Sequence, residues 1–163
     1  MTSMPARLIF WLILLCAPLA AAPEYPTMGP DIYDTKADGN VQVAKALESA
    51  TAGHKNVVIV FSANWCIWCR RLHAAFENAD VARELARHFV VVEIDVNTRN
   101  GTKRNADVDA RYGNPIAQGV PMIVVLDRTG KQLTTLSTDE LEDGEGHSPK
   151  KILAFLAKWQ PAK

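Results

Sequence analysis

Short runs of apolar and β-branched residues predict the strands of this chain. Residues 57–61, 89–94 and Met122–Leu126 are almost continuously apolar, which is typical of strands covered on both faces. A fourth strand is predicted at residues 132–136, after a turn at residues 127–130. The short turn makes the last two strands an antiparallel pair.

Apolar residues at helical spacing predict helices before, between and after these strands. The predicted helices cover residues 40–53, the stretch from a cysteine motif to Phe76, and residues 81–88, 106–112 and 148–159. Asp80 and Ser148 stand where N-caps are expected. The acidic residues 138–146 predict a surface loop, because their spacing lacks the alternating ligands of a calcium-binding EF-hand.

The order of these elements predicts the fold class. The strands of the first β–α–β segment must be parallel and joined by a right-handed crossover, whereas the last two strands are antiparallel. We therefore expect an α/β fold with a mixed sheet flanked by helices. At 163 residues the chain suits one domain with a real core.

Two cysteines stand where the first strand is expected to run into a helix, in the run NWCIWCR at residues 64–70. Cys66 and Cys69 lie one helical turn apart, on the same side. Cys66 would meet unpaired backbone N–H groups and the positive end of the helix dipole. In such a place a thiol pKa can fall to roughly 3.5–7.5, against about 8.5 when free. Cys69, a turn deeper among apolar neighbours, should keep a high pKa. The motif predicts a pair that cycles between dithiol and disulfide.

Other uses of a Cys-x-x-Cys pair fit the sequence less well. A structural zinc site with His73 as third ligand needs a fourth, and the other histidines are scattered singly. Haem attachment needs His directly after the second cysteine, where Arg70 stands. A purely structural disulfide would close only a short loop and stabilise the fold little. We expect no metal, and no cofactor other than the redox-active disulfide Cys66–Cys69.

The N-terminus has the organisation of a secretory signal peptide. Arg7 precedes an apolar run at residues 8–15, and small residues follow at positions 20–22. The apolar run is too short to span a bilayer as a mature helix. We expect residues 1–21 to be removed so that Ala22 begins the mature chain. The alternative is an N-terminal anchor that is not cleaved.

The rest of the chain indicates a compartment and excludes some partners. Loss of Cys16 with the signal leaves one cysteine pair, which fits a periplasmic or secreted protein with thiol chemistry. Residues 22–31 contain several prolines and predict an extended lead-in to a domain at residues 32–160. The charge is balanced, with 18 basic and 18 acidic residues, so nucleic acid is not an expected partner. We expect a monomer without a stable membrane span after signal cleavage.

Three stretches together resemble the thioredoxin superfamily: FSANWCIWC at residues 61–69, VEIDV at 92–96 and GVPM at 119–122. The resemblance covers residues 32–159. It points to exported thioredoxin-like proteins and to the C-terminal thioredoxin-like domain of periplasmic disulfide reductases. It implies a thioredoxin-like fold with a central mixed sheet of four or five strands. It also implies that the protein is a thiol–disulfide oxidoreductase that acts on protein disulfides. It favours reduction of these disulfides over their formation.

The resemblance also implies roles for individual residues. Cys66 matches the attacking cysteine of the family and Cys69 the resolving one. Trp65 matches the aromatic residue that flanks the active site. Pro121 matches the family's cis-proline, and the loop of Val120 and Pro121 then faces the cysteines and pairs with the substrate backbone. The alternative for Pro121 is an ordinary proline at a strand start.

Two positions depart from the family's pattern. Many thioredoxins bury an acid in the strand before the motif, where this chain has Val60. Glu93 on the neighbouring strand could replace it as a proton relay if it points toward Cys69. Otherwise Glu93 faces solvent or forms an ordinary ion pair. Ile67 and Trp68 replace the Gly-Pro of typical thioredoxins, and Trp68 either contacts the partner or covers the helix end.

The predicted reaction is thiol–disulfide exchange with protein substrates and with an upstream redox partner. The alternative function is a non-catalytic thioredoxin-fold chaperone or adaptor that binds clients through Trp65 and Trp68. Binding alone would require neither cysteine. Arg70 and Arg71 are expected to point to water, and His73 is expected to lie at the surface.

Overall fold

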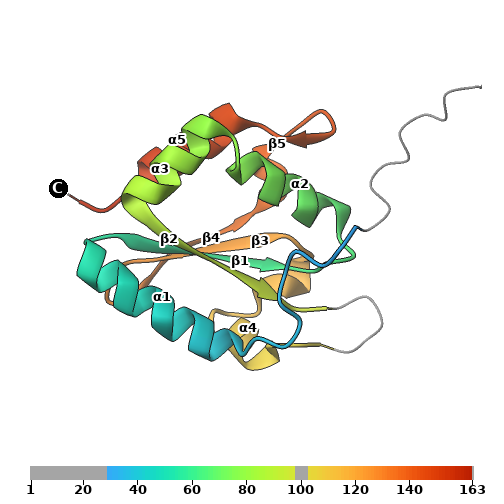
Figure 1. The fold of residues 1–163 in the computed structure, drawn as a ribbon, viewed down its shortest axis with the longest axis horizontal. Coiled ribbons are helices and arrows are strands. Elements are labelled where there is room, and N and C mark those ends of the chain that lie inside the picture. The colour runs from blue at the N-terminus through green and yellow to red at the C-terminus, as the bar shows by residue number, and fades with distance from the viewer. Residues whose placement is uncertain (1–28, 98–102, 163) are drawn as a thin grey trace, which may run out of the picture.

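The computed structural model describes residues 29–97 and 103–162. The signal peptide predicted at residues 1–21 lies outside the described residues, as does the lead-in before Gly29. The described chain forms a mixed sheet with helices on both faces (Figure 1). Within residues 29–97 and 103–162, no helix is both long and apolar enough to cross a membrane.

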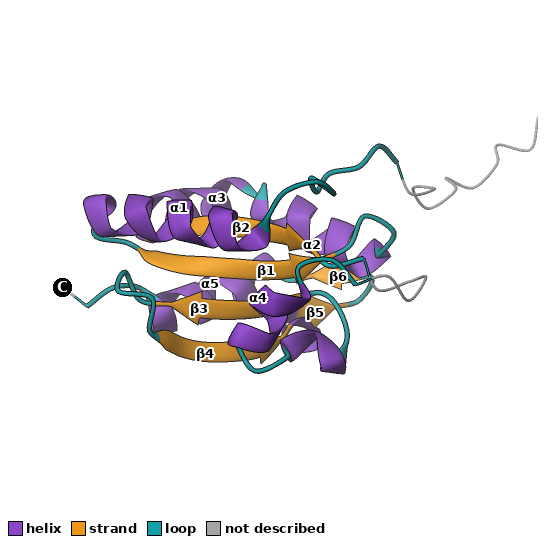
Figure 2. Cartoon of the chain, turned by 90° about the horizontal axis from the view of Figure 1, so that it is seen from below, coloured by secondary structure: helices purple, strands orange, loops and turns teal. Residues whose placement is uncertain are grey.

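The central sheet has four strands in the order β2-β1-β3-β4 (Figure 2). These strands are β1 (Asn56–Ser62), β2 (Phe89–Asp95), β3 (Met122–Leu126) and β4 (Gln132–Ser137). β1 pairs with β2 in parallel and with β3 antiparallel, and β3 pairs with β4 antiparallel. The predicted fold class is therefore confirmed, with four strands in this sheet.

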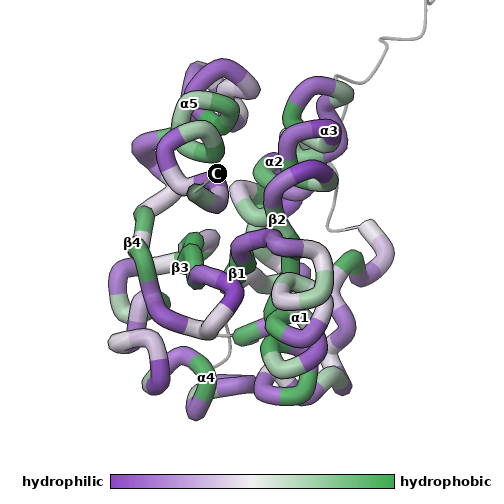
Figure 3. Tube along the Cα trace, turned by 90° about the vertical axis from the view of Figure 1, so that its left-hand side faces the viewer, coloured by the Kyte–Doolittle hydropathy of each residue, from purple (hydrophilic) through white to green (hydrophobic). Residues whose placement is uncertain are grey.

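Five α-helices flank the sheet in the described chain: α1 (Gly39–Gly53), α2 (Ile67–Phe76), α3 (Ala79–His88), α4 (Ala106–Arg111) and α5 (Pro149–Trp159). A short 3-10 turn, η1 (Pro115–Gln118), precedes β3. Figure 3 shows α1 and α4 on one side of the sheet, with α3 and α5 on the other.

Alternate residues of β1 point to opposite faces of the sheet, and each face has its own hydrophobic core. Ile59 and Phe61 pack in the core beneath α1 and α4. Val58 and Val60 pack in the core shared with α2, α3 and α5. Every residue of β1 is buried as a result. This strand fixes the position of whatever follows it in the chain.

The N-cap predicted for the third helix is wrong. The helix α3 begins at Ala79, and its N-cap is Asn78 rather than Asp80. Asn78 Oδ1 accepts from the backbone N–H groups of Asp80 and Val81, at 3.1 and 3.5 Å. Both residue types cap helices well, so their preference alone does not distinguish the two positions. Ser148 does occupy the N-cap position of α5, but its side chain forms no capping hydrogen bond.

The surface loop predicted at residues 138–146 is also wrong. The chain there forms the 3-10 helix η2 (Thr138–Leu141) and a two-stranded hairpin, β5 (Glu142–Asp143) and β6 (Gly146–His147). The Thr138 and Leu141 side chains are buried, while the acidic residues between them remain exposed. The acidic composition of the segment suggested full exposure and gave no sign that Thr138 and Leu141 are buried.

Candidate active site

The two cysteines of the motif lie at the junction of β1 and α2. Cys66 is the N-cap of α2, in an extended backbone conformation, and its Sγ accepts from the backbone N–H of Cys69 at 3.1 Å. The Cys66 N–H donates to the Ala63 carbonyl at 3.0 Å, which closes the turn after β1. Cys66 and Cys69 are joined in a disulfide. The structure is thus that of the oxidised protein.

The two sulfurs have different surroundings. Cys66 keeps 5 % of its surface exposed, whereas Cys69 is completely buried. Cys66 Sγ lies 3.5 Å from the carbonyl oxygen of Val120. The Val120–Pro121 peptide bond is cis, as the resemblance implies. This loop therefore does face the cysteines, and Cys66 is the sulfur that it approaches.

A buried amide connects residues 32 and 33, where the lead-in enters the domain, to the motif. Asn64 Oδ1 accepts from the N–H groups of Ile32 and Tyr33, at 2.8 and 2.9 Å, and Asn64 Nδ2 donates to the Tyr33 carbonyl at 2.9 Å. The Tyr33 hydroxyl in turn donates to the Cys69 carbonyl at 3.0 Å. Burial of Tyr33 raises the pKa of its phenol well above the ordinary value. Tyr33 therefore stays neutral and covers the resolving position.

Arg70 also holds the lead-in, so the expectation that it points to water is wrong. Its Nε donates to the Asn64 carbonyl at 2.9 Å, and its Nη2 donates to the carbonyls of Gly29 and Pro30, at 2.9 and 3.1 Å. The planar guanidinium suits this set of carbonyls, because its donors point in fixed directions. The carbonyls of Gly29 and Pro30 belong to a segment about forty residues earlier, so the sequence offered no sign that Arg70 binds them.

Trp68 lies between two side chains of other segments. The Arg71 guanidinium lies over its ring, with Cζ 4.5 Å from the ring centre, and the His147 ring meets it edge-on at 5.7 Å. The sequence suggested that Arg71 points to water, but its guanidinium packs against Trp68. His147 is 7 % exposed, and neither of its ring nitrogens has a hydrogen-bond partner within the described residues. Burial, reinforced by the Arg71 charge, lowers the pKa of His147 from its ordinary 6.5.

Glu93 is hydrogen-bonded to His73. His73 Nδ1 lies 2.9 and 3.2 Å from the two carboxylate oxygens of Glu93, and the two side chains are 33 % and 23 % exposed, respectively. Val60 stands opposite Glu93 in the register of β1 and β2. His73 is one turn beyond Cys69, and the Tyr33 ring packs edge-on against it at 6.2 Å. Glu93 thus has a specific partner in His73, which lies one helical turn from the buried Cys69.

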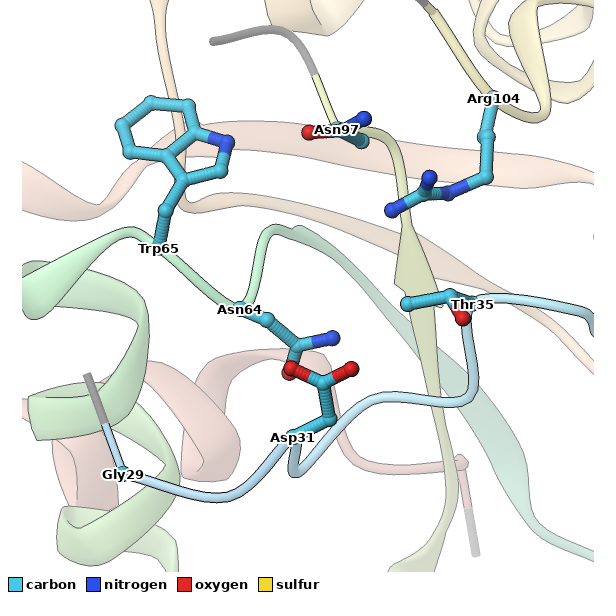
Figure 4. Close-up of a pocket in the computed structure, with 7 residues that line it drawn as sticks. All are labelled: Gly29, Asp31, Thr35, Asn64, Trp65, Asn97 and Arg104. Carbon is cyan, nitrogen blue, oxygen red and sulfur yellow. The ribbon is translucent and has the colours of Figure 1, made fainter.

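Trp65 borders a pocket of about 280 Å³ on the other side of the motif (Figure 4). Asn64, Asn97 and Arg104 line the same pocket, together with residues of the lead-in. Arg104 is fixed by an ion pair of its Nε with the buried carboxylate of Asp95 at the end of β2. Trp65, which directly precedes Cys66, therefore has a hollow beside it.

Sequence reasoning missed Asn64, Tyr33, Thr138 and His147. Tyr33 lies outside the motif, and Asn64 lies within it but has a side chain that is common in loops, so neither residue type indicated a role. Thr138 and His147 lie in the segment predicted to be a surface loop. Among the described residues, no group of three or more His, Cys, Asp and Glu side chains is arranged to hold a metal ion.

The fold and the site define a class of protein. A sequence profile of the thioredoxin-like family matches residues 39–128, which include the cysteine motif and the cis-proline, and the chain belongs to this family. The Cys66–Cys69 disulfide at the start of α2 makes it a thiol–disulfide oxidoreductase.

Individual relatives agree with that class. The crystal structure of a disulphide isomerase from Xylella fastidiosa Temecula1 has a TM-score of 0.69 and 38 % identity, covering 78 % of this chain and 95 % of that one. A DsbH oxidoreductase has a TM-score of 0.52 and 26 % identity over 71 % of this chain and 76 % of its own. The Zea mays protein disulfide-isomerase is 28 % identical over 102 residues, which are 61 % of this chain but only 18 % of that protein.

The buried histidine yields a prediction about pH. Since the folded pKa of His147 lies below 6.5, the unfolded chain takes up the proton more readily. The contribution of neutral His147 to stability is therefore complete above about pH 6.5 and is lost as the pH falls below it. Replacing it by Phe keeps an aromatic edge against Trp68 and removes the titration. We expect His147→Phe to lose less unfolding free energy than the wild type between about pH 7 and pH 5, as measured by urea denaturation.

His54→Asn is the control, because His54 is exposed at the end of α1, in a left-handed conformation that Asn tolerates. This variant should follow the wild-type pH profile. An unchanged profile in His147→Phe would show that His147 is not the group responsible.

Proposed function

We propose that this protein reduces disulfides of protein substrates in an exported compartment, with Cys66 as the attacking and Cys69 as the resolving cysteine. One observation carries the assignment of roles. Cys66 caps α2 and keeps some exposed surface, whereas Cys69 is buried under Tyr33. A helix-start N–H group stabilises a thiolate, and burial opposes one, so the reduced pair should ionise first at Cys66.

The exchange proceeds in two balanced steps. The Cys66 thiolate attacks one sulfur of the substrate disulfide, and the other substrate sulfur leaves as a thiolate that takes up a proton. Cys69 then loses its proton and attacks Cys66 Sγ, which releases the second substrate thiol. Two electrons pass to the substrate, and the Cys66–Cys69 disulfide remains. An upstream dithiol partner must reduce it for another cycle.

Similar proteins of known structure favour a reaction that begins from the reduced dithiol. The C-terminal domain of DsbD from Neisseria meningitidis shares the fold, with a TM-score of 0.54 at 21 % identity. The more similar Xylella protein is called a disulphide isomerase. Isomerisation begins with attack by a thiolate on a disulfide, so it also requires the reduced dithiol. Both reduction and isomerisation therefore favour a working form in which Cys66 is free to attack.

The substrate would bind around the exposed side of Cys66. The Val120 and Pro121 loop is placed to pair with the substrate backbone, because it lies against the sulfur. Trp65 and Trp68 flank the motif on either side and are both half-buried, so each can cover apolar substrate surface. The Trp68 ring is already held by Arg71 and His147 and would offer a fixed contact.

The compartment is inferred from the N-terminus and from chemistry. A signal peptide at residues 1–21 and a single remaining cysteine pair suit an exported oxidoreductase. We expect mass spectrometry of the native protein to find Ala22 as its first residue in the exported fraction. A native protein that retains the apolar run in the cytosol would contradict this compartment.

The two cysteine roles are tested by trapping. Cys69→Ser leaves the attacking thiol without its resolving partner, so mixed disulfides with substrates should accumulate. Cys66→Ser should trap almost none. The measurement is alkylation rate against pH for each single variant, followed by pull-down of trapped proteins. Equal reactivity of the two thiols, or faster labelling of Cys69, would reverse the assignment.

The alternative of a non-catalytic chaperone or adaptor is separated by the same variants. A binding module would hold clients through Trp65 and Trp68 whether or not Cys66 is present. We expect reduction of insulin disulfides by the wild type and only background reduction by Cys66→Ser. Equal client binding together with no reduction by either protein would favour the binding module.

Glu93 is proposed as the group that receives the Cys69 proton, because it is hydrogen-bonded to His73, which lies one helical turn beyond Cys69. Its removal in Glu93→Gln should slow resolution of the mixed disulfide by about tenfold or more and change the pH profile of that step, since general acid–base groups contribute roughly 10²–10⁴. Stopped-flow measurement of product release would separate this step from the first attack.

Glu77→Gln is the matched control. Glu77 also approaches His73, at 3.9 Å, but it is exposed on the outer side of α2. Its replacement should leave the resolution step unchanged. A similar slowing in both variants, or in neither, would show that Glu93 only forms an ordinary pair with His73.

A further inference from the structure

A groove runs beside the cis-proline loop, on the Trp68 side of the motif. It has a volume of about 220 Å³ and is lined by Trp68, residues 118–122, residues 137–139 and Glu142. Val120, which contacts Cys66 Sγ, forms part of its wall. The volume equals about seven water molecules at ~30 Å³ each, enough for one side chain of a bound polypeptide. Whatever disulfide reaches Cys66 must place a neighbouring residue near this groove.

The walls of the groove are fixed by contacts between distant segments. The Thr138 hydroxyl donates to the Pro121 carbonyl at 2.9 Å, which ties η2 to the cis-proline loop. Trp68 is held by Arg71 on its face and by His147 of β6 on its edge. The groove is therefore present before a substrate binds, and the residues next to Thr138 are held close to the reactive sulfur.

The charged residues that line the groove are both acidic. They are Asp139, which follows Thr138, and Glu142, which opens β5. Neither carboxylate forms an ion pair within residues 29–97 and 103–162. Two cations lie close by without an ion pair to either carboxylate, since Lys151 Nζ donates to the Glu142 backbone carbonyl and Arg71 lies over the Trp68 ring. The two carboxylates thus give the groove negative charge, and the other residues that line it are uncharged.

We propose that Asp139 and Glu142 are specificity determinants, which favour disulfide substrates that carry Lys or Arg next to the attacked cysteine. The inference rests on the proposed exchange reaction at Cys66. A basic side chain has a long apolar stem that can lie along Trp68 while its charged end meets the carboxylates. An acidic side chain at the same place would meet like charge. The acidic segment 138–146 thereby acquires a role in choosing substrates.

The test uses three synthetic peptide disulfides that differ only beside the cysteine, where they carry Lys, Gln or Glu. The pre-reduced protein is mixed with each peptide, and the second-order rate constant is followed by the fluorescence of Trp65 and Trp68. An exposed ion pair contributes roughly 0.2–1 kcal/mol, so two carboxylates should give about a 2- to 30-fold preference for the Lys over the Glu peptide. This ratio should shrink at high salt.

The ratio should fall to nearly one in the double variant Asp139→Asn/Glu142→Gln and should invert in Asp139→Lys/Glu142→Gln, which leaves a single positive charge among the two positions. The matched control is Glu140→Gln/Asp143→Asn, which removes the two neighbouring exposed acids that do not line the groove. The control should keep the wild-type ratio. Circular dichroism establishes that every variant is folded.

Two outcomes overturn the inference in distinguishable ways. If the wild type reduces all three peptides equally, or if the control loses selectivity as much as the groove variant, the groove does not select charge, while the exchange reaction stands. If the reduced protein reacts with none of the peptides, the proposed function itself is overturned, and the inference with it.

Discussion

The position of Cys66 at the junction of β1 and α2 is the constraint on which the site depends. The strand β1 is buried along its whole length, so its last residues cannot shift without disturbing both cores. The Cys66 sulfur then serves as the capping group of α2. Because β3 runs antiparallel to β1, with Met122 opposite Phe61, the cis-proline loop arrives at the same end of the sheet. The packing of β1 and its pairing with β3 therefore determine how far the cysteine sulfurs lie from the cis-proline loop.

The junction also places a polar residue in a buried turn, and the lead-in satisfies it. Asn64 forms three hydrogen bonds with Ile32 and Tyr33, and Arg70 adds contacts to the chain just before them. A buried polar group left without partners would cost about 1–3 kcal/mol, so the lead-in and the motif stabilise each other. The result is that Tyr33 covers Cys69, while Cys66 keeps a small exposed surface. The asymmetry of the two sulfurs comes partly from a segment outside the motif.

Sequence predicted those parts of the fold that depend on local pattern. The strands β1, β2 and β3 appear where apolar, β-branched runs stand, because a largely buried strand has little choice but to be apolar. The strand β4 has no buried residue, and its place followed from the turn before it. The cysteine pair and the loop at Pro121 followed from spacing and resemblance. Contacts between distant polar residues did not follow, as Arg70 and His147 illustrate. Their partners are set by the three-dimensional arrangement of segments, and their own residue types are equally common in exposed loops.

Three of the four residues whose roles the sequence missed lie outside the range that the family profile matches. The family profile matches residues 39–128, which hold both cysteines and the cis-proline. Tyr33 lies before that range and covers Cys69, while Thr138 and His147 lie after it and hold the cis-proline loop and Trp68. The thiol chemistry thus resides in the shared core, and the flanking segments shape what surrounds each sulfur. Because such flanks can vary without disturbing the β1–α2 junction, they are where a protein of this family can acquire its own choice of substrate.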